Sequence, residues 1–338
     1  MYKPPFTITN LMLSLCISIT EKVGQINNYQ SLKRLPILRK NNRIKSIHSS
    51  LAIEANSLSI NQVKDVIEGK IVIGPRKEIQ EVKNAYNIYN MFDKFDCFNE
   101  NDLLKAHEIL TYLVDEESGK YRNHAEGVFD GDKVIFVAPP ENMVPILMKD
   151  LFDWLKNDKE TPLLIKSCVF HYEFVFIHPF GDGNGRTARA LSYMMLIQSG
   201  YEFFRYFSIS NLVSDERGKY YRSMVNVEED EGDMTYFIDF YSNMLSRSVI
   251  RMEDHLTHHV LAGQRVKELQ SSGLLNERQL AGVKWLLEGV GDSVTVDKWK
   301  KRYKVVQETA RKDLMKLCDM GVLEKKMDGR RSVFKIIR

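Results

Sequence analysis

The sequence predicts a mainly α-helical protein with a small additional domain after it. Over most of the first 270 residues of this 338-residue chain, apolar side chains recur every three or four positions, which is the spacing of helices rather than strands. A single strong β-hairpin signal interrupts that pattern between Gly127 and Pro140. After Ser271-Ser272-Gly273, short helix and strand patterns alternate. We therefore place a domain boundary near residue 273.

Residues 1–75 are expected to form an N-terminal helical region. The apolar run from Leu11 to Ile19 is too short to span a membrane and lacks the cleavage site of a signal peptide, so an amphipathic helix is predicted there. Ser59 and Gln62 have the spacing of a capping box, which predicts that a helix begins just after Ser59.

The cysteines and charges indicate the surroundings of the protein. The four cysteines are far apart, so neither a zinc site nor a disulfide framework is predicted, and a cytoplasmic location without a membrane partner is expected. The net charge is only +3, but residues 297–338 hold 14 Lys or Arg against 6 Asp or Glu. This surplus indicates an anionic partner for that segment.

Residues 76–250 are expected to form the main domain. Predicted helices cover Ile79–Phe92, Asn101–Leu113, Pro140–Asn157 and Thr161–Ile177, and another runs from Thr235 to Gln270. The helix that ends at Ile177 is apolar on nearly every side, which is typical of a buried helix. In the hairpin, Val128 and Phe129 lead into an Asp-Gly turn.

A glycine-rich turn follows the buried helix. Gly181, Gly183 and Gly185 alternate at the start of a new helix, where unpaired backbone N–H groups and the helix dipole favour an anion. Arg186 and Arg189 are three residues apart, so they share a helix face and could both grip phosphate oxygens. The expected ligand is a polyphosphate.

Three polar side chains complete a set typical of phosphoryl transfer. Asp182 suits Mg²⁺, the amide of Asn184 could donate to a phosphate, and His178 could accept a proton at neutral pH. A Walker-type loop is excluded because Arg186 stands where that loop requires Lys after a longer spacing. A calcium loop is excluded because Tyr193 stands at its Glu position.

The segment from His178 to Arg189 resembles the Fic signature, His-x-Phe-x-(Asp or Glu)-Gly-Asn-Gly-Arg-x-x-Arg, at every fixed position. This resemblance implies a Fic-fold helical bundle with a β-hairpin flap and a protein adenylyltransferase activity. It implies that His178 deprotonates a Ser, Thr or Tyr hydroxyl of a target protein, which attacks ATP while Asp182 holds Mg²⁺. The implied nucleotide-binding residues are Gly183, Asn184, Gly185, Arg186, Arg189, Tyr220 and Tyr221. The implied flap residues are Val128, Phe129, Asp130 and Gly131.

The resemblance includes an inhibitory segment. Residues Ser50 to Asn56 are similar to the inhibitory helix of Fic proteins, (Ser or Thr)-x-x-x-Glu-(Gly or Asn), and depart from it only at Ala55. It implies that Ser50 and Glu54 restrain the enzyme, because a carboxylate that faces Arg189 would occupy the cation meant for the γ-phosphate of ATP. A second departure, Glu228 where some relatives have Asn, weakens the match at the adenine end.

Residues 273–338 resemble a winged helix-turn-helix, joined to the main domain by a helix over residues 251–272. Helices are predicted over residues 276–288, 297–303 and 307–320, and strands flank the turn Asp328-Gly329. In such a fold the side chains expected to contact double-stranded DNA are Gln307, Thr309, Arg311, Lys312, Arg330 and Arg331. A protein-docking or purely structural domain with a solvated basic face is the alternative.

Other functions stay open from sequence. The same scaffold could remove AMP from a modified protein or transfer another phosphate-linked group. A DNA-binding regulator could use the nucleotide site as a sensor, although a site that only binds would not need the base His178. The sequence does not identify the target protein, and it leaves the oligomeric state open, a homodimer included.

Overall fold

The structure is a computed structural model that describes residues 2–27, 36–130, 133–206, 209–271, 273–287, 293–328 and 331–337. These residues are predominantly helical, as the sequence predicts. They form two compact units, of which the first contains residues 39–250 and the N-terminal helix, and the second contains residues 36–38 and the described residues from Arg251 onward. Gly131 of the predicted flap and Arg330 of the predicted DNA contacts lie outside the described residues.

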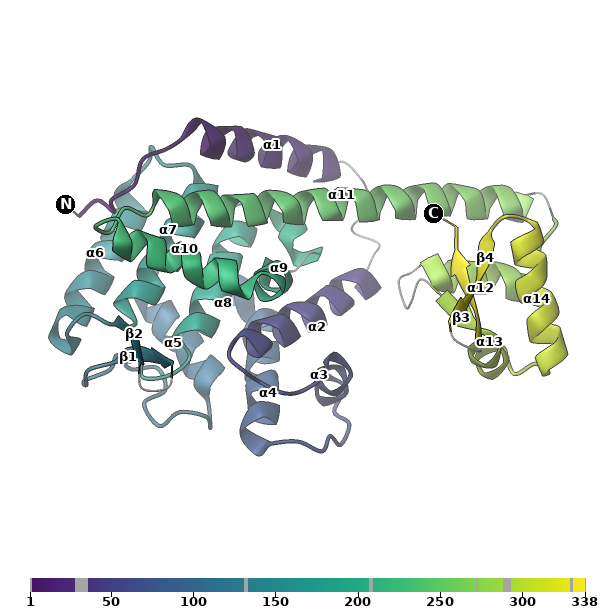
Figure 1. Ribbon diagram of the computed structural model, residues 1–338, viewed down its shortest axis with the longest axis horizontal. Coiled ribbons are helices and arrows are strands. Elements are labelled where there is room, and N and C mark those ends of the chain that lie inside the picture. Colours follow the sequence, from purple (N-terminus) through teal and green to yellow (C-terminus); the bar gives the residue numbers. More distant parts are fainter. Residues whose placement is uncertain are drawn as a thin grey trace. The chain divides into compact units, whose positions relative to one another are not determined.

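The first unit is a bundle of helices with one hairpin (Figure 1). In chain order its elements are α1 (Asn10–Asn27), α2 (Pro36–Ile53), α3 (Ile60–Ile67), α4 (Arg76–Met91), η2 (Phe92–Lys94), α5 (Glu100–Thr111), β1 (Gly127–Asp130), β2 (Lys133–Val137), η3 (Glu141–Met143), α6 (Val144–Asn157), α7 (Leu163–Ile177), α8 (Asn184–Gln198), η4 (Glu202–Tyr206), α9 (Ile209–Asp215) and α10 (Arg217–Glu229). The helix α11 (Thr235–Ser271) contributes to both units.

Local sequence signals fix several helix starts. Ser59 caps α3, and the reciprocal bonds of a capping box join it to Gln62, as predicted. The helix predicted from Pro140 begins instead as the 3₁₀ turn η3, and regular α-helix starts at Val144 with a proline in its first turn. Pro162 is the residue that immediately precedes α7.

The core of the first unit contains α7 and α8, which pack against each other (Figure 1). Phe170, Phe174 and Ile177 of α7 are each no more than 1% exposed, as the all-round apolar pattern predicts. The chain between the two helices is the glycine-rich turn. Because both helices are held by the core, the two ends of that turn are fixed in position.

The predicted hairpin is present as the antiparallel pair β1 and β2. Gly127 pairs with Val137, and the register shifts between Val128 and Phe129. Such a bulge bends a strand and increases its twist.

The second unit combines three short helices with a three-stranded antiparallel sheet of order β3-β5-β4. Its elements are α12 (Glu277–Leu287), β3 (Ser293–Thr295), α13 (Val296–Tyr303), α14 (Gln307–Asp319), β4 (Leu323–Asp328) and β5 (Arg331–Ile336). Trp299, Leu314 and Phe334 are buried in its core. Within the described ranges, no helix has both the length and the apolar content of a membrane span.

Candidate active site

His178 ends α7 in the left-handed conformation, with φ 49°, and its N–H donates to the carbonyl of Phe174 at 3.1 Å. Pro179 follows and cannot continue the helix. The His178 Nδ1 atom lies 3.2 Å from the Val175 carbonyl oxygen, which only accepts, so Nδ1 carries the hydrogen and Nε2 keeps its lone pair. Burial lowers the pKa of His178. The ring is therefore neutral at pH 7 and could accept a proton at Nε2.

Arg122 fixes the strained backbone at His178, a role that sequence reasoning missed. Its side chain is buried, with Nε donating to the His178 carbonyl at 2.7 Å and Nη2 donating to the Pro139 carbonyl at 2.5 Å. Its backbone N–H donates to the carbonyl of Pro179 at 2.9 Å. One guanidinium group therefore joins the end of α7 to the chain that follows the hairpin.

The glycines of the turn allow close packing on both sides. Gly183 precedes α8 with φ 82°, and a Cβ atom there would lie 2.8 Å from Thr111 Cγ2. A Cβ atom on Gly185 would overlap Oε1 of Glu54. The Glu54 carboxylate therefore lies directly on the first turn of α8, where unpaired N–H groups favour an anion.

His107 of α5 packs against the glycine-rich turn and bonds its backbone. Its ring stacks on Phe180, with centroids 3.5 Å apart and planes 6° apart. The Gly119 N–H donates to His107 Nδ1 at 3.0 Å, so Nε2 carries the hydrogen and donates to the Asp182 carbonyl at 2.9 Å. Burial lowers the pKa of His107 to about 4. Neutral His107 thus fixes the backbone of the turn. No signal in the sequence indicates this role, because His107 is a single histidine within a predicted helix.

Asn184 uses its side-chain amide within the turn. Its Oδ1 accepts from the Phe180 N–H at 3.0 Å, and its Nδ2 donates to the Phe180 carbonyl at 2.7 Å. The side chain is buried. Asn184 therefore shapes the turn, and the predicted contact with a phosphate stays a prediction.

Arg189 is fully enclosed beside the turn and bonds the segment predicted to be inhibitory. Its Nη2 donates to Glu54 Oε1 at 2.7 Å and to the Ser50 carbonyl at 2.9 Å, while Nε donates to Ser50 Oγ at 3.0 Å. Burial alone would lower the pKa of Arg189, but the charge of Glu54 outweighs it and raises that pKa. The expected ion pair between Glu54 and Arg189 is present.

Arg186 bonds two carboxylates. Its Nη2 donates to Asp182 Oδ1 at 2.6 Å, and its Nη1 donates to Oε1 of Glu81, on α4, at 2.8 Å. Burial raises the pKa of Asp182, but the charge of Arg186 outweighs that effect and lowers it. The other oxygen of Glu81 accepts from Asn56 Nδ2 at 2.8 Å. Glu81, which sequence reasoning missed, therefore links the segment after Glu54 to the motif arginine.

The tyrosine pair is divided between core and surface. Tyr220 is 2% exposed, and its hydroxyl lies 2.8 Å from His171 Nε2. Tyr221 is 38% exposed, with the Arg217 guanidinium 5.5 Å from its ring centroid. Of the two, only Tyr221 presents a ring to solvent.

The predicted DNA contacts belong to the second unit. Gln307, Arg311 and Lys312 are exposed on the first turns of α14, and Thr309 is half-buried among them. Arg331 is exposed at the start of β5. As for metals, no cluster of three or more His, Cys, Asp or Glu side chains suited to an ion occurs in the described part of the chain.

Comparison with known proteins relates the first unit to one family. Residues 97–196, which include the whole glycine-rich turn, match the family model "Fic/DOC family". Protein adenylyltransferase fic-1 of Caenorhabditis elegans is 26% identical over 248 residues, which are 69% of this chain and 46% of that protein. A probable protein adenylyltransferase of Aquifex aeolicus is 29% identical over 182 residues, which are 48% of this chain and 54% of that protein. The chain thus spans about half the length of these curated relatives.

A solved structure extends the likeness to nearly the full length. The crystal structure of a Fic family protein from Desulfovibrio desulfuricans is 31% identical in sequence and superposes with a TM-score of 0.71. The match covers 99% of this chain and 98% of that one. From the motif, the geometry of the turn and this full-length match, we conclude that the chain belongs to the Fic/DOC family.

Proposed function

We propose that this chain transfers AMP from ATP to a Ser, Thr or Tyr hydroxyl of a target protein, and to itself, and that Glu54 restrains the reaction. One observation carries the proposal: the Glu54 carboxylate lies on Gly185 at the start of α8 and bonds Arg189. Helix N-termini and arginines attract phosphates as well as carboxylates. Glu54 thus occupies a place suited to the phosphates of a nucleotide. The relatives named protein adenylyltransferase support the same activity.

The proposed reaction uses His178 as a general base. The target hydroxyl passes its proton to His178 Nε2 while its oxygen forms a bond to the α-phosphorus of ATP. The bond from that phosphorus to the oxygen bridging to the β-phosphate breaks, and pyrophosphate leaves with the electron pair. The lowered pKa of His178 keeps Nε2 free of a proton before the reaction. Arg122 holds the ring's backbone in position.

The phosphates would be held by the first turn of α8 together with Arg186 and Arg189. Asp182 fits as a ligand of Mg²⁺, because among the described residues its Oδ2 meets only Lys77, at 3.3 Å, and is not the oxygen that Arg186 bonds. Mg²⁺ in phosphate sites commonly takes one or two protein carboxylates, with phosphates and waters as the remaining ligands. The ion would neutralise phosphate charge. Tyr221 is the more accessible of the two tyrosines proposed for the nucleotide.

The hairpin would align the target. Its strands β1 and β2 pair only with each other among the described strands, so their outer edges could add a strand of the target's main chain. Strand addition reads main chain, which fits a transferase that accepts more than one hydroxyl residue.

The test is self-modification with labelled ATP. Removal of a charge-assisted bond costs about 1.5–3 kcal/mol, so Glu54→Gly should raise the initial rate about tenfold or more over wild type. His178→Ala and the double variant should incorporate no label, which controls for non-enzymatic labelling. An equal rate for wild type and Glu54→Gly, with His178→Ala silent, would remove Glu54 from the proposal and leave the transferase standing.

Parallel assays with other substrates distinguish AMP transfer from AMP removal and from transfer of another phosphate-linked group. The same Glu54→Gly protein is incubated with labelled UTP and CDP-choline, and wild type is incubated with an AMP-modified target. Label from ATP alone supports AMP transfer. Release of AMP from the target without any transfer would identify the protein as a de-AMPylase instead.

A second function, DNA binding by the second unit, is favoured by one observation. Gln307, Arg311 and Lys312 are exposed together on the first turns of α14, while Leu314 of the same helix is buried. In a winged helix-turn-helix this is the face that enters the major groove. We expect full-length protein to retard duplex DNA with a salt-dependent affinity, and Arg311→Ala to weaken that binding relative to Lys77→Ala. Equal affinity of the two variants would favour a docking role for the domain.

A further inference from the structure

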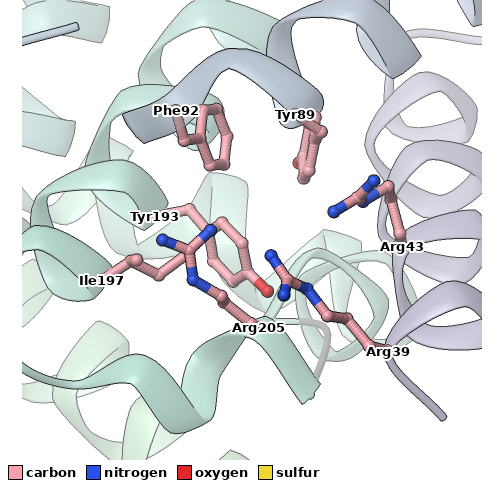
Figure 2. Close-up of a pocket in the computed structure, with 7 residues that line it drawn as sticks. All are labelled: Arg39, Arg43, Tyr89, Phe92, Tyr193, Ile197 and Arg205. Atoms are coloured by element: carbon pink, nitrogen blue, oxygen red, sulfur yellow. The ribbon is translucent and has the colours of Figure 1, made fainter. Parts of the chain in front are cut away.

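A pocket in the first unit is lined by three arginines. Arg39 and Arg43 lie one turn apart on α2, and Arg205 comes from η4 (Figure 2). The three guanidinium groups point into the same space beside the ring of Tyr193 (Figure 2). The other lining residues are Tyr89, Phe92 and Ile197. Segments about 160 residues apart in the sequence thus bring three positive charges together.

These charges are only partly balanced. Arg205 pairs with Asp93 and with Glu202, the latter at 2.6 Å. The Arg43 side chain donates to the neutral amide oxygen of Asn90, and Nε of Arg39 is buried without a hydrogen-bond partner. Among the residues that the structure describes, neither Arg39 nor Arg43 forms an ion pair with a carboxylate. Burial, and next the charge of Arg39, lower the pKa of Arg43.

Three of the residues that line the pocket are aromatic and pack against one another. Ring centroids of Tyr89 and Phe92 are 4.8 Å apart, and both lie within 6 Å of the Tyr193 centroid. All three side chains are buried. The space that the lining residues enclose is small, with a cavity volume of about 10 Å³, and the site is partly open to solvent. Roughly 10–15 Å³ holds a single water, so an ion larger than water would bind at the open side, with the arginine side chains shifted around it.

We propose that Arg39, Arg43 and Arg205 bind a small phosphate-type dianion, either inorganic phosphate or a short phosphate ester. Guanidinium groups bond phosphate oxygens in pairs, and a tetrahedral dianion offers oxygens in three directions at once. A dianion would offset the two charges that lack a carboxylate partner. It would also relieve the repulsion between Arg39 and Arg43.

The bound anion would bear on inhibition, a consequence that rests on the proposed function. Arg39 and Arg43 are near the start of α2, whereas Ser50 is in its last turn and Glu54 directly follows its last residue. An anion held by Arg43 and Arg205 would join α2 to η4 in the packing seen here, in which Glu54 bonds Arg189. By linkage, a ligand that binds this arrangement stabilises it. Phosphate should therefore slow self-modification by wild type more than by Arg39→Gln.

Binding is measured by calorimetry at constant ionic strength and pH 8, with inorganic phosphate and glycerol phosphate as separate arms. We expect saturable binding to wild type, weakened about tenfold or more in Arg39→Gln and in Arg43→Gln, since each loses a charge-assisted contact. Arg222→Gln, an exposed surface arginine, is the matched control and should bind as wild type does. Arg189→Gln should keep saturable binding, weakened less than in Arg39→Gln, because it leaves the pocket intact and removes only the coupled bond to Glu54. This separates the pocket from the proposed active site.

A measurement on the unaltered protein guards against variants that fold poorly. Phenylglyoxal modifies accessible arginines, and mass spectrometry of peptides locates them; phosphate should protect Arg39 and Arg43 but not Arg222. Equal modification with and without phosphate, or wild-type affinity in both glutamine variants, would overturn the site. Normal binding without any effect on self-modification would overturn only its link to Glu54. Binding of the ester but not of inorganic phosphate would identify the ester as the ligand.

Discussion

Ala55 ends α2 in a backbone conformation that favours glycine, with φ 65°. The Asn56 N–H donates to the Leu51 carbonyl at 3.1 Å, and the Ala55 N–H donates to the Ala52 carbonyl at 3.2 Å. These two bonds make a Schellman cap, whose left-handed position is usually Gly or Asn. Ala55, which departs from the Fic inhibitory pattern, therefore adopts a strained backbone conformation at the cap next to Glu54.

Ala55→Gly should consequently stabilise the first unit. Glycine removes about 1–2 kcal/mol of left-handed strain, and its freer unfolded chain offsets about half of that, so the free energy of unfolding should rise by about 0.5–1 kcal/mol. Urea unfolding monitored by circular dichroism checks the change. Ala52→Gly, in the regular part of the same helix, is the matched control and should lower stability by about 1 kcal/mol. Loss of stability in both variants would contradict the strain argument.

His107 makes stability depend on pH. Its pKa is about 4 in the fold against 6.5 in the unfolded chain, so the unfolded chain binds more protons between these values. Stability is therefore fully present above pH 6.5 and falls by about 3 kcal/mol as the pH drops from 6.5 to 4. Buried His171, whose pKa is lowered to about 3, acts in the same direction.

Chemical unfolding at several pH values tests this dependence. His107→Gln should be less stable than wild type at pH 7 and should show a shallower fall below pH 6.5. An undiminished slope in His107→Gln would assign the pH dependence to other groups.

At the scale of elements, three helices meet through Glu81. The side chain stands on α4, bonds Arg186 of α8, and bonds Asn56 just beyond α2. Nearby, Glu78 of α4 accepts from the backbone N–H of Ser57 at 2.7 Å. Two hydrogen bonds to α4 thus fix the chain after Glu54. In one of them the acceptor is Glu81, whose carboxylate also accepts from Arg186.

Glu81→Gln should loosen the segment that carries Glu54. The loss of charge weakens two bonds at once, so self-modification should rise several-fold over wild type, since charged hydrogen bonds contribute about 1.5–3 kcal/mol. In the Glu54→Gly background the same substitution should bring no further rise. A fall in rate in both backgrounds would instead mean that Glu81 acts by orienting Arg186. Glu229→Gln, a surface replacement, controls for charge.

These elements also define what sequence could predict. The turn from His178 to Arg189 is contiguous, so its composition predicts an anion-binding helix start, whereas the pair between Glu54 and Arg189 is implied only by the resemblance of residues 50–56 to the Fic inhibitory helix. Glu81 and Arg186 are 105 residues apart in the sequence, and a single Glu in a helix is usually exposed to solvent. Their contact therefore becomes visible only in the folded structure. Similarly, the sequence predicts that the Asn184 amide donates to a phosphate. Its hydrogen bonds to the backbone of Phe180 depend on the folded geometry of the turn and could not be predicted. Caps and periodicity located most helices, whereas they did not distinguish the 3₁₀ turn η3 from the α-helix that follows it.

For the whole molecule, each unit has a core of its own. In the second unit Trp299 is fully buried, and its Nε1 donates to Asp313 at 3.2 Å. Arg278 donates to the same carboxylate at 2.6 Å. Burial raises the pKa of Asp313, but the bonds from Arg278 and Trp299 outweigh it and hold that pKa below its usual range. A buried, bonded carboxylate and an indole thus organise the second unit, while the residues proposed for catalysis all belong to the first.

Gly282→Ala should therefore damage one unit alone. A Cβ atom on Gly282 would overlap the six-membered ring of Trp299, which is enclosed and cannot move aside, so the second unit should lose about 1–3 kcal/mol. Hydrogen exchange followed by mass spectrometry should show faster exchange beyond residue 273 and unchanged exchange in α7 and α8. Self-modification of the Glu54→Gly protein should be unaffected, since its site lies elsewhere. Gly218→Ala in α10 is the matched control, because open space surrounds that position and alanine favours a helix by about 1 kcal/mol. Faster exchange throughout the chain would mean that the two units unfold together.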